Sequence, residues 1–231
     1  MLNLFAEIFD FFLPRICPAC NTKLSVDEKV VCYSCLSKIK IATEETLKFE
    51  YDRKFKGQNI ISGFTSLYIF EKDKELQQII HSLKYNQKFL AGKFLGKKLG
   101  ETNSYKISSW DIDCIVPIPL HHLKKTERGY NQSFYIAKGL SKSLNIQISK
   151  YFLKRKKFTQ SQTTMDLIER EENMKEAFVA KKTSKLKGLN ILLVDDVITT
   201  GSTIKECGKT LLNANADKVY AASIAITDFT D

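Results

Sequence analysis

The sequence lacks any apolar run close to the roughly 18 residues that a membrane-spanning helix needs. Its first twelve residues have apolar side chains at helical spacing, but Glu7 and Asp10 interrupt them and no basic start precedes them. The segment therefore lacks the form of a signal peptide, and we expect an amphipathic helix that packs on the body, with shallow membrane contact as the alternative. Internal repeats and low-complexity tracts are also absent, so a repeat architecture is not expected.

Acidic residues are the minority among the charged ones, 26 against 36 basic residues, and the formal net charge is +10. A basic surface favours polyanions such as nucleic acid, acidic lipid or pyrophosphate. Solvated helix faces rich in lysine explain the same composition equally well, so charge alone does not choose a partner. The length of 231 residues allows one full α/β domain and a small appendage.

Four of the six cysteines form two Cys-x-x-Cys pairs, Cys17 with Cys20 and Cys32 with Cys35. Four thiolates at this spacing can converge on Zn²⁺ in a tetrahedron with bonds of about 2.3 Å. Disulfides are the competing interpretation, but a chain without a secretory signal favours a reducing compartment and hence zinc. A site of four cysteines has no open position, so the metal would be structural and would supply the folding energy of a small module. We expect this module within residues 1–45.

Aliphatic runs predict buried strands, and apolar residues recurring every three or four positions predict helices. The elements expected in this way are strands over 64–70, 113–118, 147–153, 191–194 and 219–226, a helical pattern over 76–95, and helices over 132–144 and 204–212, with Cys114 and Cys207 as core residues. Strands alternating with helices predict an α/β fold with a mostly parallel sheet, whose ligands bind at the carboxyl ends of the strands. Residues 40–60 are polar without periodicity and predict a linker, so the α/β domain is expected over 60–231.

The segment 191–203 is the most informative part of the sequence. Four aliphatic residues are followed by Asp195 and Asp196, and a turn of threonine, glycine and serine over 199–203 then leads into a helix. Carboxylates accept hydrogen bonds from sugar hydroxyls, and the free N–H groups of a helix N-terminus favour a phosphate. A ribose 5-phosphate is one ligand in which sugar hydroxyls and a phosphate lie close together. The structural alternative is a buried strand, a capping aspartate and an ordinary turn; a nucleotide P-loop is excluded because no Gly-x-x-x-x-Gly-Lys-Ser/Thr occurs.

Two further segments are basic and rich in polar side chains. Residues 117–132 connect a strand to a helix and include Arg128, which can hold a second phosphate group. The segment 154–162 includes Arg155, Thr159 and Gln162, and its basic, hydroxyl-rich composition is typical of a mobile lid. His121 and His122 lie in an exposed context and are not expected to be catalytic, and Lys84 with Tyr85 is expected to mark the end of a helix.

The segment 191–203 resembles the signature of type I phosphoribosyltransferases, which bind 5-phosphoribosyl-1-pyrophosphate (PRPP). This resemblance implies that Asp195 and Asp196 hold the ribose hydroxyls and that Mg²⁺ accompanies the ligand. It also implies which residues wrap the 5-phosphate, namely Thr199, Thr200, Gly201, Ser202 and Thr203. If the protein transfers a phosphoribosyl group, we expect Arg128 and Arg155, with Thr159 and Gln162, to contact pyrophosphate.

The motifs in their order also resemble the ComF family, which is named for competence, the uptake of DNA by bacteria. These motifs are the two cysteine pairs, Val-Pro-Ile-Pro with Arg-Gly-Tyr-Asn-Gln, Arg-x-x-x-Thr-x-x-Gln, Arg-x-x-Asn and Asp-Asp-Val-Ile-Thr-Thr-Gly-Ser-Thr. The family is similar to the transferase half of amidophosphoribosyltransferase. The resemblance spans residues 2–228 and implies a phosphoribosyltransferase-like sheet flanked by helices, with a small N-terminal zinc ribbon. It also implies a cytoplasmic protein, or alternatively one that is peripheral at the inner membrane. The partners that it implies are a helicase-like protein and a membrane DNA channel.

Two functional hypotheses remain open from the sequence. The first is an enzyme of phosphoribosyl transfer, for which no residue identifies the acceptor. The alternative is a non-catalytic protein that binds single-stranded DNA or nucleotides at the phosphoribosyl site, with lysines, Phe158, Tyr130 and Tyr135 following a single strand.

Overall fold

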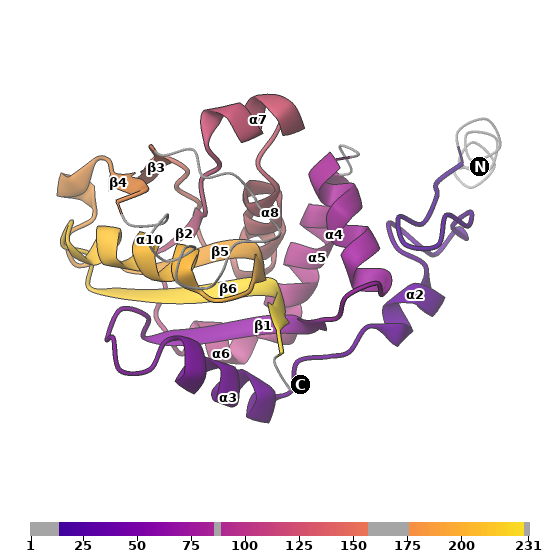
Figure 1. The fold of residues 1–231 in the computed structure, drawn as a ribbon, viewed down its shortest axis with the longest axis horizontal. Coiled ribbons are helices and arrows are strands. Elements are labelled where there is room, and N and C mark those ends of the chain that lie inside the picture. Colours follow the sequence, from indigo (N-terminus) through magenta and orange to yellow (C-terminus); the bar gives the residue numbers. More distant parts are fainter. Residues whose placement is uncertain (1–13, 86–88, 157–175, 229–231) are drawn as a thin grey trace.

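The computed structural model describes residues 14–85, 89–156 and 176–228. Its centre is a four-stranded sheet in the order β1-β6-β5-β2, formed by β1 (Gly63–Phe70), β6 (Lys218–Thr227), β5 (Asn190–Ile198) and β2 (Cys114–Pro117) (Figure 1). All three pairings are parallel, so every strand of this sheet presents its carboxyl end at one edge. The parallel α/β fold expected from the sequence is confirmed.

Alternate residues of β5 divide the interior into two cores. Leu192 and Val194 pack on one face of the sheet, and Ile191 and Leu193 pack on the other. The first core is covered by α4 (Glu75–Tyr85), α5 (Phe89–Thr102), α6 (Ser104–Ser108) and α8 (Gln132–Leu144). The second core is covered by α3 (Glu44–Lys54), α10 (Ser202–Leu212) and the antiparallel pair β3 (Leu153–Arg155) and β4 (Phe178–Ala180), which η1 (Thr183–Lys185) follows. Cys114 and Cys207 are buried in this second core, as expected.

Two glycines bring α5 and α8 into backbone contact. A Cβ atom at Gly96 would overlap the carbonyl oxygen of Ile136, and one at Gly139 would overlap the carbonyl oxygen of Lys93. Only glycine permits an approach this close, because any side chain would force the helix axes apart. The contact holds α8 firmly against α5 and so positions the first turn of α8 at the carboxyl edge of the sheet.

The linker predicted for residues 40–60 is wrong, because this segment contains α3. The hydroxyl of Thr43 accepts a hydrogen bond from the backbone N–H of Thr46 and caps the helix. The buried face of α3 includes the ion pair between Glu50 and Lys54, at 2.9 Å. A helix whose buried side chains are partly ionic shows no apolar periodicity, which explains why a pattern of hydrophobic residues misses it.

The cysteine-containing segment continues into the body of the protein. It includes α2 (Tyr33–Lys38), which begins after Cys32, and Ile41 then forms an antiparallel bridge with Tyr68 of β1. The buried side chains of Leu24 and Val31 belong to the same apolar cluster as those of α4. The module and the sheet therefore share one core. The amphipathic helix expected over the first twelve residues lies outside the described residues.

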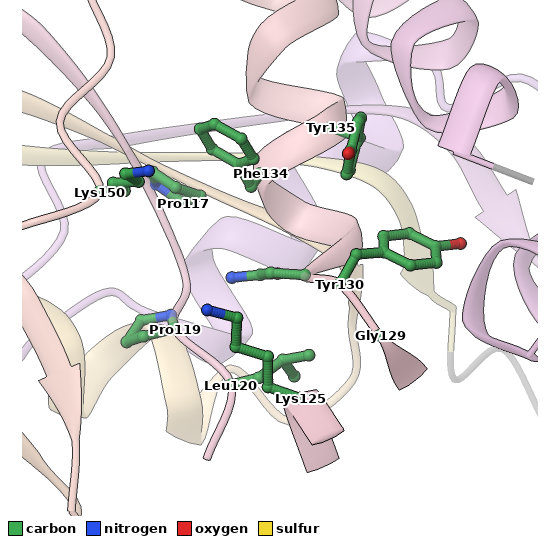
Figure 2. A pocket seen from close by; sticks show the side chains of 10 residues that line it. Pro117, Pro119, Leu120, Lys125, Gly129, Tyr130, Phe134, Tyr135 and Lys150 are labelled. Carbon is green, nitrogen blue, oxygen red and sulfur yellow. The ribbon is translucent and has the colours of Figure 1, made fainter. Parts of the chain in front are cut away.

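The helical pattern over 76–95 forms α4 and α5, and α4 ends at Tyr85, as expected. Two further expectations from the sequence need correction. The strand predicted over 147–153 is a single bridge between Ile148 and Ile115, and β3 begins only at Leu153. The segment 117–132, expected to be a loop, contains α7 (His122–Arg128), which together with the start of α8 encloses a pocket (Figure 2). Among the described helices, none is both long and apolar enough to cross a membrane.

Candidate functional site

The two adjacent carboxylates lie within the last half of β5, which continues to Ile198 and does not end before Asp195. Val197 and Ile198 extend the pairing with β6, opposite Ala225 and Ile226. Because side chains alternate along a strand, the two aspartates leave the sheet in different directions. They therefore have different partners.

Asp195 and Asp196 are each held by a specific set of hydrogen bonds. The hydroxyl of Ser133 donates to Oδ1 of Asp195 at 2.9 Å, and the backbone N–H of Asp196 donates to the same oxygen at 2.9 Å. Oδ2 of Asp196 lies 3.1 Å from Nζ of Lys84 and accepts from Nε2 of Gln132 at 3.4 Å. The partners come from α4 and from the first turn of α8, so the position of α8 against α5 determines the geometry of the acidic pair.

The two carboxyl groups have opposite pKa shifts. Burial, and then the negative charge of Asp196, raises the pKa of Asp195 to about 7. Burial also disfavours the ionised form of Asp196, but the charge and hydrogen bond of Lys84 outweigh it and hold the pKa of Asp196 below its ordinary value. The pair thus combines one firmly ionised carboxylate with one carboxyl group that exchanges its proton near neutral pH.

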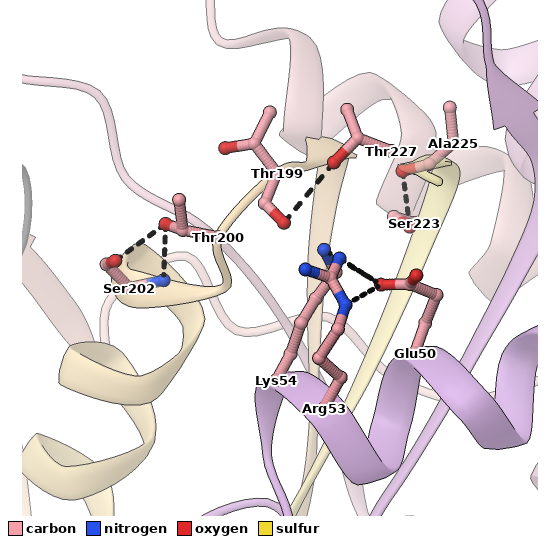
Figure 3. A network of polar contacts seen from close by, with 9 residues as sticks. All are labelled: Glu50, Arg53, Lys54, Thr199, Thr200, Ser202, Ser223, Ala225 and Thr227. Atoms are coloured by element: carbon pink, nitrogen blue, oxygen red, sulfur yellow. Dashed lines mark hydrogen bonds and ion pairs between the residues drawn. The ribbon is translucent and has the colours of Figure 1, made fainter. Parts of the chain in front are cut away.

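The residues 199–203 form the turn between β5 and α10 and line a small cavity of about 40 Å³ together with Asp195. We call this turn the phosphate loop. Gly201 is the N-cap of α10 at φ +79°, and no side chain caps the helix there. The hydroxyls of Thr200 and Ser202 lie 2.6 Å apart, and Figure 3 shows them at the start of α10. The N–H of Ser202 donates to Oγ1 of Thr200 at 3.3 Å, and the following N–H groups of the first turn favour an anion.

The end of α3 lies under the phosphate loop. A Cβ atom at Gly201 would come within 2.8 Å of the ring of Phe55, the residue that ends α3. One turn earlier, the carboxylate of Glu50 binds Lys54 at 2.9 Å and Arg53 at 2.6 Å, and Figure 3 shows this cluster beside the loop. The loop is therefore supported from below by a helix that the sequence did not predict.

Four cations surround the acidic pair. Lys84 comes from α4, Lys124 and Arg128 come from one face of α7, and Arg155 comes from β3. Burial, followed by the positive charges of Arg155 and Arg128, lowers the pKa of Lys124. Burial also lowers the pKa of Arg155, and the carboxyl group of Asp195 opposes the shift. The repulsion that Lys124 experiences from Arg155 and Arg128 would be relieved by a bound anion.

The structure brings together part of the predicted site and adds residues that the sequence missed. Asp195, Asp196, Arg128, Arg155 and the phosphate loop lie at the same edge of the sheet. The predicted contacts Thr159 and Gln162 lie outside the described residues, as does Phe158. The missed residues are Lys84, which was expected only to end a helix, Lys124, Gln132 and Ser133.

His121 also differs from the expectation of an exposed side chain. It is 5% exposed, and its Nδ1 accepts a hydrogen bond of 3.4 Å from the backbone N–H of Leu123. This bond caps α7, so His121 has a structural role at the start of the helix that presents Lys124 and Arg128.

The four clustered cysteines fit a tetrahedral metal. The Sγ atoms of Cys17, Cys20, Cys32 and Cys35 all lie within 4.8 Å of one another. A tetrahedron with Zn–S bonds of about 2.3 Å has edges of about 3.8 Å, and the sulfurs of Cys20 and Cys32 are 3.7 Å apart. Burial raises the pKa of the Cys32 and Cys35 thiols, so without a cation these groups would stay protonated. The donor set and its spacing suit a metal such as zinc.

Comparison with known proteins agrees with this geometry. Residues 131–227 match the family model of the phosphoribosyl transferase domain. Competence protein F of Haemophilus influenzae is 35% identical over 114 residues, which are 49% of this chain and 50% of that protein. DNA utilization protein YhgH of Escherichia coli K12 is 30% identical over 147 residues, 62% of this chain and 64% of that protein. The chain thus matches about half the length of the first relative and less than two thirds of the second.

Among solved structures, glutamine PRPP amidotransferase from B. subtilis in complex with ADP and GMP is similar at 19% identity and a TM-score of 0.40, covering 67% of this chain and 29% of that one. The matched domain contains the acidic pair, the phosphate loop and the first turn of α8, and the curated relatives are competence and DNA utilization proteins. Within the matched regions, the chain is similar to proteins of the ComF family.

Proposed function

We propose that this protein binds PRPP, or a related ribose 5-phosphate ligand, together with Mg²⁺ at the carboxyl end of β5. One observation carries the proposal: the buried acidic pair lies between the phosphate loop and a group of four cations. A ligand that matches this arrangement has hydroxyl groups in its middle and a phosphate at each side. PRPP has its ribose hydroxyls between a 5-phosphate and a pyrophosphate.

In this proposal each group of residues has a separate task. The carboxylates of Asp195 and Asp196 accept hydrogen bonds from the ribose hydroxyls, and the N–H groups at the start of α10 hold the 5-phosphate. Arg128 and Arg155 bind the pyrophosphate, and we propose the same task for Thr159 and Gln162, which lie outside the described residues. When bound, Mg²⁺ neutralises part of the charge on the pyrophosphate.

If the protein is catalytic, the reaction is phosphoribosyl transfer. The bond between C1 of the ribose and the pyrophosphate breaks, the pyrophosphate leaves with the bond electrons, and positive charge develops on the ring. The two carboxylates, close to the ribose, stabilise that charge. No described residue identifies the acceptor.

The names of the relatives support a role in bacterial DNA uptake. In this role the protein acts on the cytoplasmic side of the inner membrane with a helicase-like protein and a membrane DNA channel, as the family resemblance implies.

The proposal is tested by thermal unfolding with PRPP and Mg²⁺. A ligand present at 100 times its Kd stabilises the folded state by about 2.7 kcal/mol, so the melting temperature should rise. The double variant Asp195→Asn/Asp196→Asn should abolish the rise, and Lys84→Gln should reduce it because Asp196 loses its counter-charge. Lys142→Gln, an exposed substitution on α8, is the control and should keep the full rise.

No rise in the wild-type protein, or an undiminished rise in the double variant, would refute the site. Pyrophosphate release in the presence of a panel of amines and bases then separates the enzyme from a binding protein. A rise in melting temperature without pyrophosphate release would leave ligand binding intact and exclude transferase activity on that panel.

A second candidate function is binding of single-stranded DNA, which a specific surface favours. Lysines lie over exposed or half-buried rings along α5 and α8: Nζ of Lys138 is 4.8 Å from the ring centroid of Phe134 and 5.3 Å from that of Tyr135, and Nζ of Lys93 is 5.9 Å from the Tyr135 centroid. Alternating rings and cations suit the bases and phosphates of a single strand. Binding measured on filters should weaken steeply as salt rises, and a flat response would exclude this function.

A further inference from the structure

A second and larger pocket lies beside the acidic pair. It has a volume of about 310 Å³ and is enclosed by the carboxyl end of β2, the segment around α7, the start of α8 and Lys150. None of its lining residues belongs to the cavity at the phosphate loop. The volume falls at the lower end of the roughly 300–1,000 Å³ that small-molecule sites occupy. We call it the aromatic pocket.

Aromatic rings in fixed orientations form one side of the aromatic pocket. Tyr130 and Tyr135 meet edge to face with centroids 5.3 Å apart, and Phe134 meets Tyr135 at 5.8 Å. The hydroxyl of Tyr130 donates a hydrogen bond to the carbonyl of Leu83, and the side-chain amide of Asn131 donates to the carbonyl of Ile118 at 2.9 Å. These bonds hold the wall in place before any ligand arrives, which lowers the entropy cost of binding.

Two lysines supply positive charge to the pocket, and Nζ of Lys150 lies 5.6 Å from the ring centroid of Phe134. Figure 2 shows Lys125 and Lys150 on the side of Pro117 and Pro119, opposite the rings of Tyr130 and Tyr135. Within the described residues neither lysine forms an ion pair with a carboxylate. Two ammonium groups that line one pocket and have no carboxylate partner among the described residues favour an anionic ligand.

The helix α7 separates these charges from those of the acidic pair. Lys124 and Arg128 are four residues apart and therefore share one face of α7, and the charge of Arg128 acts on Asp196. Lys125, the residue after Lys124, lines the aromatic pocket. The same short helix thus presents cations to two different places.

We propose that the aromatic pocket binds one nucleotide, with the base against the aromatic rings and the phosphate at Lys125 and Lys150. A planar base uses the ring faces, and a phosphate uses the two ammonium groups. Inorganic phosphate would leave the rings without a partner, and a neutral aromatic compound would leave the lysines without one. A free mononucleotide and a nucleotide within a single strand share this chemistry. The proposal goes beyond the ribose phosphate site and does not depend on it.

The first turn of α8 contributes to both sites. Gln132 and Ser133 bind the acidic pair, whereas Asn131 and Phe134 line the aromatic pocket. A nucleotide in the aromatic pocket is therefore held next to the proposed ribose site by the same helical turn, without occupying it.

The test is calorimetric titration of the full chain at low salt with 5′-dAMP and, separately, with a short oligodeoxyadenylate. Phe134→Leu keeps an apolar side chain but removes the ring, and Lys125→Gln removes a charge at an exposed position. Each should weaken binding by about five-fold or more, the size of a lost base–aromatic contact. Lys142→Gln, a lysine of α8 outside the pocket, should leave binding unchanged.

The two ligands distinguish the sources of the nucleotide. Binding of 5′-dAMP that the pocket variants weaken supports a free nucleotide, and binding of the oligonucleotide alone, weakened by the same variants, supports a single strand. The proposal is overturned if neither ligand binds, if both pocket variants behave like Lys142→Gln, or if inorganic phosphate binds as tightly as 5′-dAMP. Stabilisation by PRPP should persist in Phe134→Leu, so failure of the ribose site and failure of this pocket give different results.

Discussion

At the scale of single residues, two neighbouring aspartates behave as different acids. Asp196 has the ammonium group of Lys84 3.1 Å from its carboxylate, and Asp195 has a hydroxyl and a backbone N–H as its hydrogen-bond donors. A full positive charge outweighs the cost of burial, whereas neutral donors do not. The direction in which each side chain leaves β5 therefore determines its protonation at neutral pH.

The raised pKa of Asp195 predicts a dependence of stability on pH. Between its ordinary value of 3.8 and about 7, the folded chain keeps a proton that the unfolded chain releases. The free energy of unfolding should therefore fall as pH rises through this window, by up to about 1.4 kcal/mol per pH unit from this group. Urea unfolding of the wild type and of Asp195→Asn from pH 4 to 7 measures the effect as a difference in slope.

Substitution of the exposed Asp217 by asparagine is the matched control and should keep the wild-type slope. Equal slopes in the wild type and Asp195→Asn would show that Asp195 is ionised throughout and would contradict the assignment.

At the scale of elements, the phosphate loop depends on its contact with α3. Gly201 has φ +79° and the ring of Phe55 directly beneath it, so a side chain at this position meets both backbone strain and a clash. Gly188 has a similar φ of +75° but open space around it. Comparing substitutions at Gly201 and Gly188 therefore separates the cost of backbone strain from the cost of the clash with Phe55.

Gly188→Ala should cost about 1–2 kcal/mol of stability from backbone strain alone. Gly201→Ala should cost clearly more, about 2–4 kcal/mol, because Phe55 must also move. Denaturant unfolding measures both values, and thermal unfolding with PRPP should show a reduced shift for Gly201→Ala only. Equal costs for the two variants would show that α3 does not support the loop.

The sequence predicts well the features that contiguous residues form, and it misses the contacts between residues that are far apart in the chain. The strand β5 and the phosphate loop are contiguous, so an aliphatic run followed by acids and a glycine turn predicts both. Lys84 is far from Asp196 in sequence, and nothing near it indicates that α4 ends at the carboxyl edge of the sheet. The helix α3 was missed because Glu50 and Lys54 are buried as an ion pair, which a search for apolar periodicity cannot recognise.

At the scale of the whole molecule, the cysteine-containing segment shares its core with the sheet. Cys17, Cys32 and Cys35 are buried in the same cluster as the apolar side chains of α4, and Lys38 of α2 lies 3.8 Å from Glu75 at the start of α4. A metal bound by the four cysteines therefore stabilises the body of the protein as well as its own segment.

Protein purified without a chelator should contain one zinc ion per chain, as measured by mass spectrometry of the metal. Cys35→Ser should lose it, and a strong chelator should lower the melting temperature of the wild type by several degrees, because the four clustered thiols, three of them buried, lose their cation. Cys114→Ala, a cysteine in the sheet and outside the cluster, is the control and should keep the metal. Equal zinc contents in the two variants, or a metal-free wild type, would refute the centre.

The sheet order has a consequence for how this protein can be divided. The recognisable transferase region, residues 131–227, contains β5 and β6, but their outer neighbours β2 and β1 both precede it in the chain. A piece cut to that region would have a central sheet of two strands with both edges bare, too few to be stable alone. It would also lack Lys84, the counter-charge of Asp196. We therefore expect that a fragment able to fold must also include β1 and β2, and so must be longer than the matched residues 131–227.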